Sequence, residues 1–353
     1  MKLKNIETPA LIIDLDLLEK NVSTMKAFLA PKELALRPHY KSNKSTYIAH
    51  MQIREGAKGI TCAKLSEAED LIQAGIKDVL IANQIVEPSK IARVAYLAGC
   101  CYLTICVDNI KNIEQLEAAA AAQDTIIHVL IEYEVFMNRC GVSSPEEFLK
   151  LAKKIDACPH LVFEGIQAYA GHLSHECDYE KRKSEAEMIE KRLCDLKEYV
   201  ESNGLKVKEI SGVSTGTVEF KVDGSVFTEI QAGSYLFMDS SYNALDLKFK
   251  NSLFLLTQVI SKNDFVITDA GVKSISVDQQ PPPVFREYPN LPVKFSEEHA
   301  KIPAEGTDIE IGEQLMLIPS HCCTAINLHD FVYLIRNNEV VDRIPITSRG
   351  KSL

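Results

Sequence analysis

The sequence of 353 residues lacks both an apolar segment that could span a membrane and one that could direct secretion. Its apolar runs, such as Leu253 to Leu256, fall far short of the roughly 20 residues that a helix needs to cross a bilayer. The opening residues 1–7 contain no apolar region of the kind found in signal peptides. We therefore expect a cytoplasmic protein without a membrane partner.

Positive charge is also scarce. The chain has 39 Lys and Arg against 49 Asp and Glu, which gives a net charge of -10. Because nucleic-acid binding depends on clustered Lys and Arg that displace counterions, we expect no nucleic-acid partner. Ten cysteines are scattered along a chain without a secretory segment, so most are expected to be buried hydrophobic side chains.

Apolar strand-like runs alternate with segments of helical spacing through the first two thirds of the chain. In the helical segments apolar residues recur three or four positions apart, as at Leu65, Ala68 and Leu71. Strands that alternate with helices pair in parallel through right-handed crossovers, and eight of them predict a closed (β/α)8 barrel of the TIM type. The eight expected strands are residues 34–38, 59–63, 78–82, 102–107, 126–132, 161–167, 207–211 and 228–231.

From about residue 246 the pattern changes to short β-rich runs separated by turns. Three consecutive prolines, Pro281 to Pro283, exclude a central strand or helix interior at that point. We therefore expect an α/β chain with a barrel at residues 10–245 and a smaller, mostly β domain at residues 246–353. A long charged helix is expected at residues 179–202, ending before Asn203-Gly204.

Lys41 lies at the carboxyl end of the first expected strand. In an α/β barrel this end gathers the loops that carry out chemistry. A lysine removed from water there can lose its proton and form a Schiff base with an aldehyde. A single lysine in a loop is more often a surface residue, so position alone leaves both interpretations open.

Motifs in a consistent order resemble the family of D-threonine aldolases and D-serine dehydratases, which are pyridoxal phosphate enzymes of the alanine racemase fold type. The resemblance covers nearly the whole chain and implies that Lys41, the first lysine of its cluster, carries pyridoxal 5'-phosphate. It also implies that residues 1–9 pack with the β domain and that the chain forms a homodimer. The motifs are Thr8-Pro9-Ala10-Leu11, Arg37-Pro38-His39-Tyr40-Lys41, Ser66-Glu67-Ala68-Glu69, Arg139-Cys140-Gly141-Val142, Gly171-His172, Ser214-Thr215-Gly216-Thr217, Ala232-Gly233-Ser234-Tyr235, Phe237-Met238-Asp239 and His321-Cys322-Cys323.

Two loops carry residues suited to a phosphate group. Thr215, Gly216 and Thr217 follow the seventh strand and offer backbone N–H groups and hydroxyls. A second donor set, Gly233-Ser234-Tyr235, follows the eighth strand, and phosphate sites on barrels favour the loops after strands 7 and 8. Such clusters are usually plain turns, but the resemblance implies that both loops hold the cofactor phosphate.

The resemblance assigns three further residues to the cofactor. It implies that Arg139 hydrogen-bonds the phenolic oxygen of the cofactor, although a surface ion pair is the alternative. Tyr169 is expected in the same site, and Gln231 is expected to face the pyridine nitrogen with a neutral amide.

Two stretches depart from the family pattern. Glu134 and Phe136 stand where the family usually has Asp and Gly before the arginine, which leaves the shape of that loop open. Asn43 stands where a histidine is usual near the active lysine, which leaves the substrate range open.

His321 and Cys323 lie two residues apart, so on an extended segment both side chains would point to one face. An imidazole and a thiolate form half of a zinc site with open positions for water or substrate. Such a pair alone is more often coincidence, but the resemblance implies a divalent metal. Thiolate favours zinc, with manganese as the alternative. Cys322 is expected to point away, and His329 or Asp330 could support the site or lie on the surface.

The resemblance implies a lyase acting on β-hydroxy D-amino acids. The dehydratase branch has cysteine at the position of Cys323 and the aldolase branch has aspartate, so elimination to a 2-oxo acid and ammonia ranks first, with Lys41 removing the α-proton. The alternative is retro-aldol cleavage to glycine and an aldehyde, with His172 taking the hydroxyl proton unless it is a core histidine. A racemase, a noncatalytic cofactor-binding protein and a metal-free barrel also remain. D-serine dehydratase-type elimination ranks first, but the sequence does not fix the substrate, since D-serine, D-threonine and 3-hydroxy-D-aspartate differ only at the β substituent.

Overall fold

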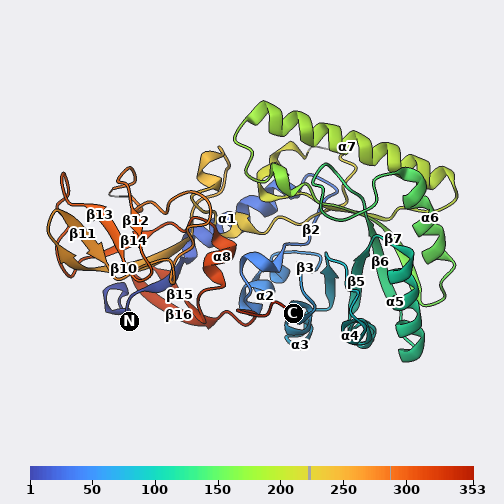
Figure 1. Ribbon diagram of the computed structural model, residues 1–353, viewed down its shortest axis with the longest axis horizontal. Coiled ribbons are helices and arrows are strands. Elements are labelled where there is room, and N and C mark those ends of the chain that lie inside the picture. The colour runs from blue at the N-terminus through green and yellow to red at the C-terminus, as the bar shows by residue number, and fades with distance from the viewer. Residues whose placement is uncertain (222–223, 287) are drawn as a thin grey trace. The chain divides into compact units, whose positions relative to one another are not determined.

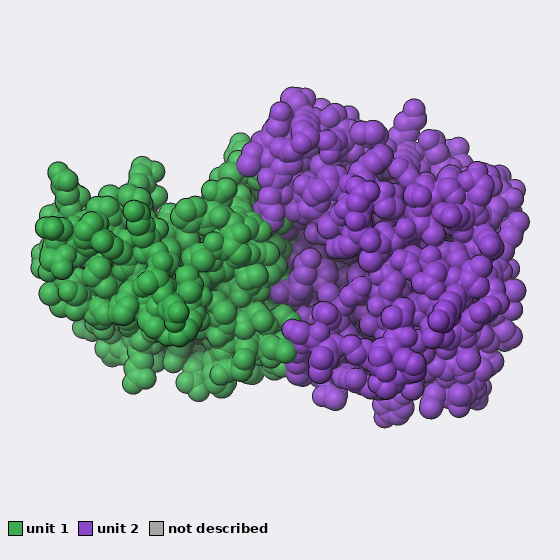
Figure 2. Space-filling model, in the orientation of Figure 1, with its two compact units in different colours: residues 1–25, 42–47, 234–350 green, residues 26–41, 48–233, 351–353 purple. Residues whose placement is uncertain are grey.

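The computed structural model describes residues 1–221, 224–286 and 288–353 (Figure 1). Its contacts divide the chain into two compact units (Figure 2). The barrel unit comprises residues 26–41, 48–233 and 351–353, and the β unit comprises residues 1–25, 42–47 and 234–350. The expected domains at residues 10–245 and 246–353 with 1–9 stay a prediction. The compact units have other boundaries, and segments of both units alternate along the first 48 residues. None of the helices within the described ranges is long and apolar enough to cross a membrane.

Eight parallel strands form the sheet of the barrel unit, in the order β2-β9-β8-β7-β6-β5-β4-β3. The N–H groups of Lys58 and Thr61 donate to the carbonyls of Leu36 and Pro38, so the segment that leads into β3 is bonded back to β2. The predicted (β/α)8 fold is confirmed. The strands are β2 (Ala35–Leu36), β3 (Ile60–Cys62), β4 (Asp78–Ile81), β5 (Tyr102–Val107), β6 (Ile127–Glu132), β7 (Leu161–Ala168), β8 (Glu209–Gly212) and β9 (Glu229–Ile230).

Helices separate these strands, and polar residues begin several of them. The Glu87 carboxylate, for example, accepts N–H groups of the first turn of α4, and Asp178 accepts the N–H of Lys181 at the start of α7. The long helix predicted at residues 179–202 is confirmed as α7. The helices are α1 (Leu15–Leu29), α2 (Thr46–Arg54), α3 (Leu65–Gln73), α4 (Pro88–Ala98), α5 (Ile110–Gln123), α6 (Pro145–Asp156) and α7 (Tyr179–Ser202).

A network of charges fills the barrel where several strands begin. Arg37 is 2% exposed, and its Nε lies 3.0 Å from both carboxylate oxygens of Glu229, the first residue of β9. Its guanidinium also pairs with Asp78 of β4, and Lys58 lies 3.2 Å from Glu229. Burial raises the pKa of Glu229, but Arg37 and Lys58 outweigh it and hold that pKa below its usual range. The opposite end of such a barrel carries the chemistry, so this network serves stability.

We predict that Glu229→Gln lowers the free energy of unfolding by about 3–5 kcal/mol, because it leaves the buried Arg37 charge without its partner. In the unmodified protein the Glu229 contribution is fully present above the unfolded pKa of about 4.3. It is lost as the pH falls through the lower folded pKa. Urea unfolding at pH 7 and along a pH series measures both effects.

Glu55→Gln is the matched control, since it removes an ion pair with Lys26 whose side chains are 47% and 59% exposed. Exposed pairs contribute about 0–1 kcal/mol. Equal losses in the two variants would contradict a stabilising role for the buried network.

The β unit contains a second sheet of eight strands in the order β12-β13-β11-β10-β1-β15-β16, with β14 paired to β10. Residues 10–14, which the sequence assigned to the barrel, form the strand β1 inside this sheet, antiparallel to β10 and parallel to β15. Ile12, Phe254 and Ile335 pack in its core. The strands are β1 (Ala10–Asp14), β10 (Leu253–Lys262), β11 (Phe265–Thr268), β12 (Lys294–Phe295), β13 (Ala300–Pro303), β14 (Gln314–Leu317), β15 (Phe331–Arg336) and β16 (Glu339–Pro345).

Candidate functional site

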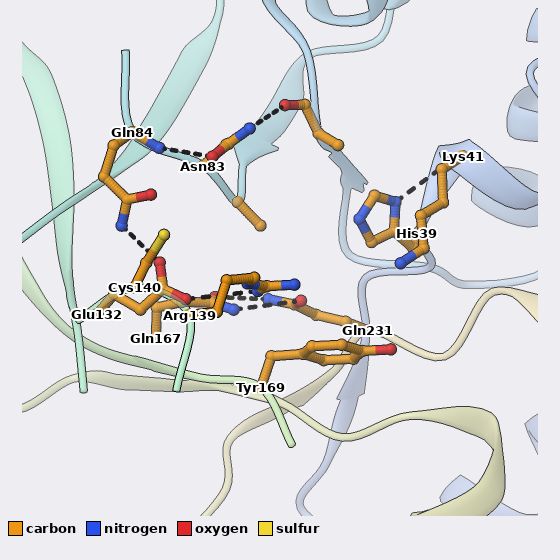
Figure 3. Close-up of a pocket in the computed structure, with 12 residues that line it drawn as sticks. His39, Lys41, Asn83, Gln84, Glu132, Arg139, Cys140, Gln167, Tyr169 and Gln231 are labelled. Carbon is orange, nitrogen blue, oxygen red and sulfur yellow. Dashed lines mark hydrogen bonds and ion pairs between the residues drawn. The ribbon is translucent and has the colours of Figure 1, made fainter. Parts of the chain in front are cut away.

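One pocket of the barrel unit is lined by residues that end or follow the parallel strands (Figure 3). The structure brings together four residues that the sequence assigned to the cofactor, namely Lys41, Arg139, Tyr169 and Gln231. Two other polar residues of this pocket, His39 and Cys140, lie in the motifs named from the sequence but were given no role. The sequence did not mark the remaining ones, which are Asn83, Gln84, Glu132 and Gln167.

Lys41 lies in a short 3-10 turn, Tyr40–Ser42, that follows β2. Its N–H donates to Nδ1 of His39 at 3.3 Å, and its amine Nζ lies 5.3 Å from the centroid of the Tyr169 ring. The guanidinium carbon of Arg139 lies 5.7 Å from the same centroid. Two cationic groups therefore approach one aromatic ring.

The turn that carries Lys41 is fixed through its neighbour Tyr40. The Tyr40 side chain is fully buried and donates from its hydroxyl to Oδ2 of Asp70 at 2.8 Å. The other oxygen of Asp70 accepts from the amine of Lys351 at 2.9 Å. Helix α3 and the last residues of the chain thus hold this turn in place.

The loop that carries Arg139 contains a backbone conformation that usually requires glycine, here adopted by another residue. Phe136 has φ 67°, in the left-handed region that favours glycine. The Glu134 carboxylate accepts the N–H of Asn138 at 2.8 Å. Burial raises the pKa of Glu134, but N–H donors of Asn138, Phe136 and Met137 outweigh it and hold that pKa below its usual range. Of the two departures from the family pattern, Glu134 therefore supports the loop through its carboxylate, whereas the Phe136 side chain is exposed.

Glu132 lies beside Arg139 and was not predicted. Its Oε1 is 3.5 Å from Nη2 of Arg139, and its Oε2 accepts from Nε2 of Gln84 at 2.5 Å (Figure 3). Burial raises its pKa, although the hydrogen bonds from Gln84 and Arg139 oppose that shift. The sequence signal is a carboxylate at the end of a mostly apolar strand. Glu132 thus restricts the guanidinium of Arg139.

Gln231 belongs to a buried network of neutral groups. Its Nε2 donates to Oε1 of Gln167 and to Oγ of Ser211, both at 2.7 Å. Both amide hydrogens are then used inside the barrel. The neutral amide expected from the sequence is therefore held in one orientation.

The first predicted phosphate loop forms a 3-10 turn, η4 (Thr215–Phe220). The N–H of Ser214 donates to Oγ1 of Thr217 at 3.2 Å. A Cβ on Gly216 would lie 2.2 Å from the carbonyl oxygen of Ser174, so only glycine fits there. In the second loop Gly233 ends the barrel unit, and Ser234 and Tyr235 begin a 3-10 turn of the β unit.

His172 is not among the residues that line the Lys41 pocket in the described parts of the chain. It lies in a 3-10 turn, Gly171–Leu173, after β7. Its Nε2 is 3.6 Å from Oε2 of Glu185 on α7. Its proposed role as a proton acceptor stays a prediction.

The predicted metal pair lies in the β unit at the start of a short helix, α8 (Cys322–Ile326). His321 is extended but Cys323 is helical, so the expectation of an extended segment is wrong. The helix starts here because the N–H of Cys322 donates to the buried Asp239 carboxylate at 2.9 Å. Cys322 is fully buried, and Oγ of Ser234 lies 3.9 Å from Sγ of Cys323.

The His321 and Cys323 side chains nevertheless interact. Burial lowers the pKa of His321, but hydrogen bonds with Cys323 and Asp278 outweigh it and raise that pKa to about 9. Burial likewise raises the pKa of Asp239 to about 6. No group of three or more His, Cys, Asp and Glu side chains arranged for a metal occurs in the described ranges.

His329 and Asp330, which the sequence left open, have partners of their own. Nε2 of His329 is 2.7 Å from the carbonyl oxygen of Ser274, and Asp330 pairs with Arg349. The carboxylates near the metal pair are Asp239 and Asp278 instead. Asp239 lies in a motif that the sequence analysis named, whereas nothing in the sequence marks Asp278.

Comparison with known proteins first defines the class. The model of the alanine racemase N-terminal domain matches residues 13–241, and that of a putative serine dehydratase domain matches residues 252–335. The chain is thus an alanine racemase-like barrel with a serine dehydratase-type second part. It belongs to the family of D-threonine aldolases and D-serine dehydratases, which are fold type III pyridoxal phosphate enzymes.

Individual relatives extend this result. A D-threonine aldolase of Arthrobacter sp. is 37% identical, covering 99% of this chain and 94% of the relative. A 3-hydroxy-D-aspartate aldolase of Paracoccus denitrificans is 35% identical, covering 98% of this chain and 93% of the relative. A D-threo-3-hydroxyaspartate dehydratase of Delftia sp. is 30% identical, covering 78% of this chain and 74% of the relative. The crystal structure of D-threonine aldolase from Filomicrobium marinum has a TM-score of 0.97 and 34% identity, covering 100% of this chain and 98% of that one.

We predict that Gly216→Ala destabilises the protein by about 1–3 kcal/mol, because the added Cβ collides with the backbone carbonyl of Ser174 and the η4 turn must move. Thermal unfolding measures the loss. Gly99→Ala is the control, since its Cβ would lie 3.2 Å from a methyl of Thr125 and 3.3 Å from the carbonyl oxygen of Tyr96, contacts that a shift of a few tenths of an ångström relieves. An equal change in both variants would show that the close approach of Gly216 is not needed.

Proposed function

We propose that the protein is a pyridoxal phosphate-dependent, divalent-metal-assisted lyase of β-hydroxy D-amino acids. The observation that carries the proposal is the convergence of Lys41, Arg139 and Tyr169 in one pocket at the carboxyl ends of the strands. An amine, a guanidinium and an aromatic ring held together at this end of a barrel are suited to an anionic aromatic aldehyde.

The residues of the pocket fit pyridoxal phosphate. The Lys41 amine can condense with an aldehyde, and the Tyr169 ring offers a face near it. Arg139, restrained by Glu132, can donate to a phenolic oxygen, and the η4 turn offers N–H groups and hydroxyls for a phosphate. When bound, the cofactor supplies an electron sink for the α-carbon of an amino acid.

The protein's own residues would move a proton and orient the cofactor. The Lys41 amine, once released from the aldehyde, can take a proton from the α-carbon or return one to it. Arg139 would present a charged group to the cofactor and Gln231 a neutral amide, since both line the pocket of Lys41.

His321 and Cys323 are the residues that would hold the metal ion. Their side chains interact, and an imidazole with a thiolate is a donor set that suits zinc, with manganese as the alternative. A divalent ion acts as a Lewis acid on a bound hydroxyl. A solved structure of the same fold, a D-threo-3-hydroxyaspartate dehydratase variant, is described as a metal-free form, so metal binding is at issue for that protein too.

Retro-aldol cleavage is the reaction that we place first. The two relatives that span 98–99% of this chain at 35–37% identity are aldolases. Elimination, which the sequence ranked first on Cys323 alone, is the second candidate. The dehydratase relative supports it but covers 78% of the chain.

A product assay separates the two reactions. The purified protein is incubated with pyridoxal phosphate, Zn²⁺ or Mn²⁺, and D-threonine, 3-hydroxy-D-aspartate or D-serine, and the products are identified by NMR. We expect glycine with an aldehyde from D-threonine or 3-hydroxy-D-aspartate, and no product from the L isomers. A 2-oxo acid with ammonia would establish elimination instead, and the absence of both product sets would contradict the proposed lyase.

We predict that Lys41→Ala abolishes the visible absorption of the protein-bound Schiff base and lowers turnover at least about 10³-fold, since the covalent link and the proton carrier are both lost. Lys111→Ala, at an exposed position of α5, should leave both unchanged. Retention of the Schiff-base band in Lys41→Ala would assign the cofactor to another lysine.

A further inference from the structure

Asp278 lies beside the proposed metal pair on a loop of the β unit that no motif marks. We infer that Asp278 is a positioning residue that fixes the tautomer and ring orientation of His321, so that Nε2 is the nitrogen left for a metal ion. The inference rests on the proposed metal site and adds to it the group that prepares the ligand.

The contacts of Asp278 join the two parts of the candidate site. Its Oδ2 lies 3.1 Å from Nδ1 of His321, and its Oδ1 accepts from Oγ1 of Thr324 at 2.9 Å. Thr324 directly follows Cys323 on α8. One carboxylate therefore ties the imidazole to the helix that carries the thiol.

The loop of Asp278 is fixed to the turn of His321 by further hydrogen bonds. Oγ of Ser276 donates to the carbonyl oxygen of His321 at 2.8 Å and lies 3.0 Å from its N–H. The N–H of Gln279 donates to Oγ of Ser320 at 2.8 Å. Because bonds on both sides of Asp278 hold the backbone, its carboxylate is presented to Nδ1 in a defined position.

The chemistry of the two groups determines the tautomer. A neutral imidazole has one N–H, and an ionised carboxylate can only accept. With Asp278 as the acceptor, Nδ1 of His321 carries a hydrogen. Nε2 of Gln279 lies 3.4 Å from the same nitrogen and is the longer of the two contacts. A metal ion would then displace the proton of Nε2 and bind at that nitrogen.

The exposure of Asp278 limits what it can contribute. Its side chain is 44% exposed, so solvent screens its charge and the direct electrostatic gain is small. Selection of a tautomer depends on the direction of the hydrogen bond and survives that screening. Loss of such a partner typically weakens metal binding about 10- to 100-fold.

The test measures Zn²⁺ and Co²⁺ affinity of the full-length protein by titration against a chromophoric chelator, with the Co²⁺-thiolate absorption band as the spectroscopic signature. We expect Asp278→Ala to weaken binding about 10- to 100-fold. Asp278→Asn should lose less, because its amide oxygen can still accept from Nδ1. At saturating Co²⁺ the thiolate band should persist in both variants, since Cys323 is retained.

Asp330→Asn is the matched control, because Asp330 is also a partly exposed carboxylate in an ion pair of the β unit, with Arg349. It should leave the affinity unchanged. Thr324→Val removes only the hydroxyl that orients Asp278 and should weaken binding by a smaller factor than Asp278→Ala. This variant keeps the test available if Asp278→Ala does not fold.

The outcomes separate the inference from the proposed function. The proposed metal site is wrong if the unmodified protein binds neither ion, or if Cys323→Ala binds the ions as tightly as the unmodified protein. If only the unmodified protein binds them, unchanged metal affinity in Asp278→Ala overturns the role of Asp278 alone. Where Asp278→Ala does not fold, unchanged affinity in both Asp278→Asn and Thr324→Val has the same meaning.

Discussion

The hydrogen bonds that join β2 to the segment before β3 close the ring of parallel strands, and the site in the barrel unit depends on that closure. The carbonyls of Leu36 and Pro38 accept these bonds, which fixes the backbone between them. Arg37 inside this stretch reaches the charge network where other strands begin, and Lys41 follows four residues later in the pocket at their carboxyl ends. One short segment thus connects the stabilising end of the barrel with the reactive end.

The two ends of the barrel are stabilised differently, one by paired buried charges and the other by a loop with backbone strain. In the buried network Arg37 and Lys58 are matched by carboxylates, so the groups hold one another in place. In the pocket the loop of Arg139 contains a non-glycine residue at positive φ, Phe136, held by hydrogen bonds to Glu134. Strain of this kind is tolerated where the surrounding structure enforces it, and it is frequent at functional sites.

Local patterns were sufficient to predict the eight barrel strands and α7, because each strand is an apolar run and α7 is a charged stretch that ends before Asn203-Gly204. They placed residues 10–14 in the barrel instead of the β unit, because a buried apolar strand reads alike in either sheet. The family resemblance assigned Lys41, Arg139, Tyr169 and Gln231 to one site, and all four line the same pocket. Asp278 was beyond prediction, since it meets a histidine 43 positions away only through packing. The two-residue spacing of the metal pair misled because a helix starts inside it.

Elimination and retro-aldol cleavage differ in which proton the protein must move. Elimination removes a proton from the α-carbon, which the Lys41 amine can accept. Retro-aldol cleavage removes the proton of the β-hydroxyl while the bond between the α and β carbons breaks, and Lys41 can then protonate the α-carbon. The identity of the hydroxyl base therefore bears on the reaction more directly than the proposed metal ligand Cys323. His172, half-exposed beside Glu185, is the base that the sequence suggests.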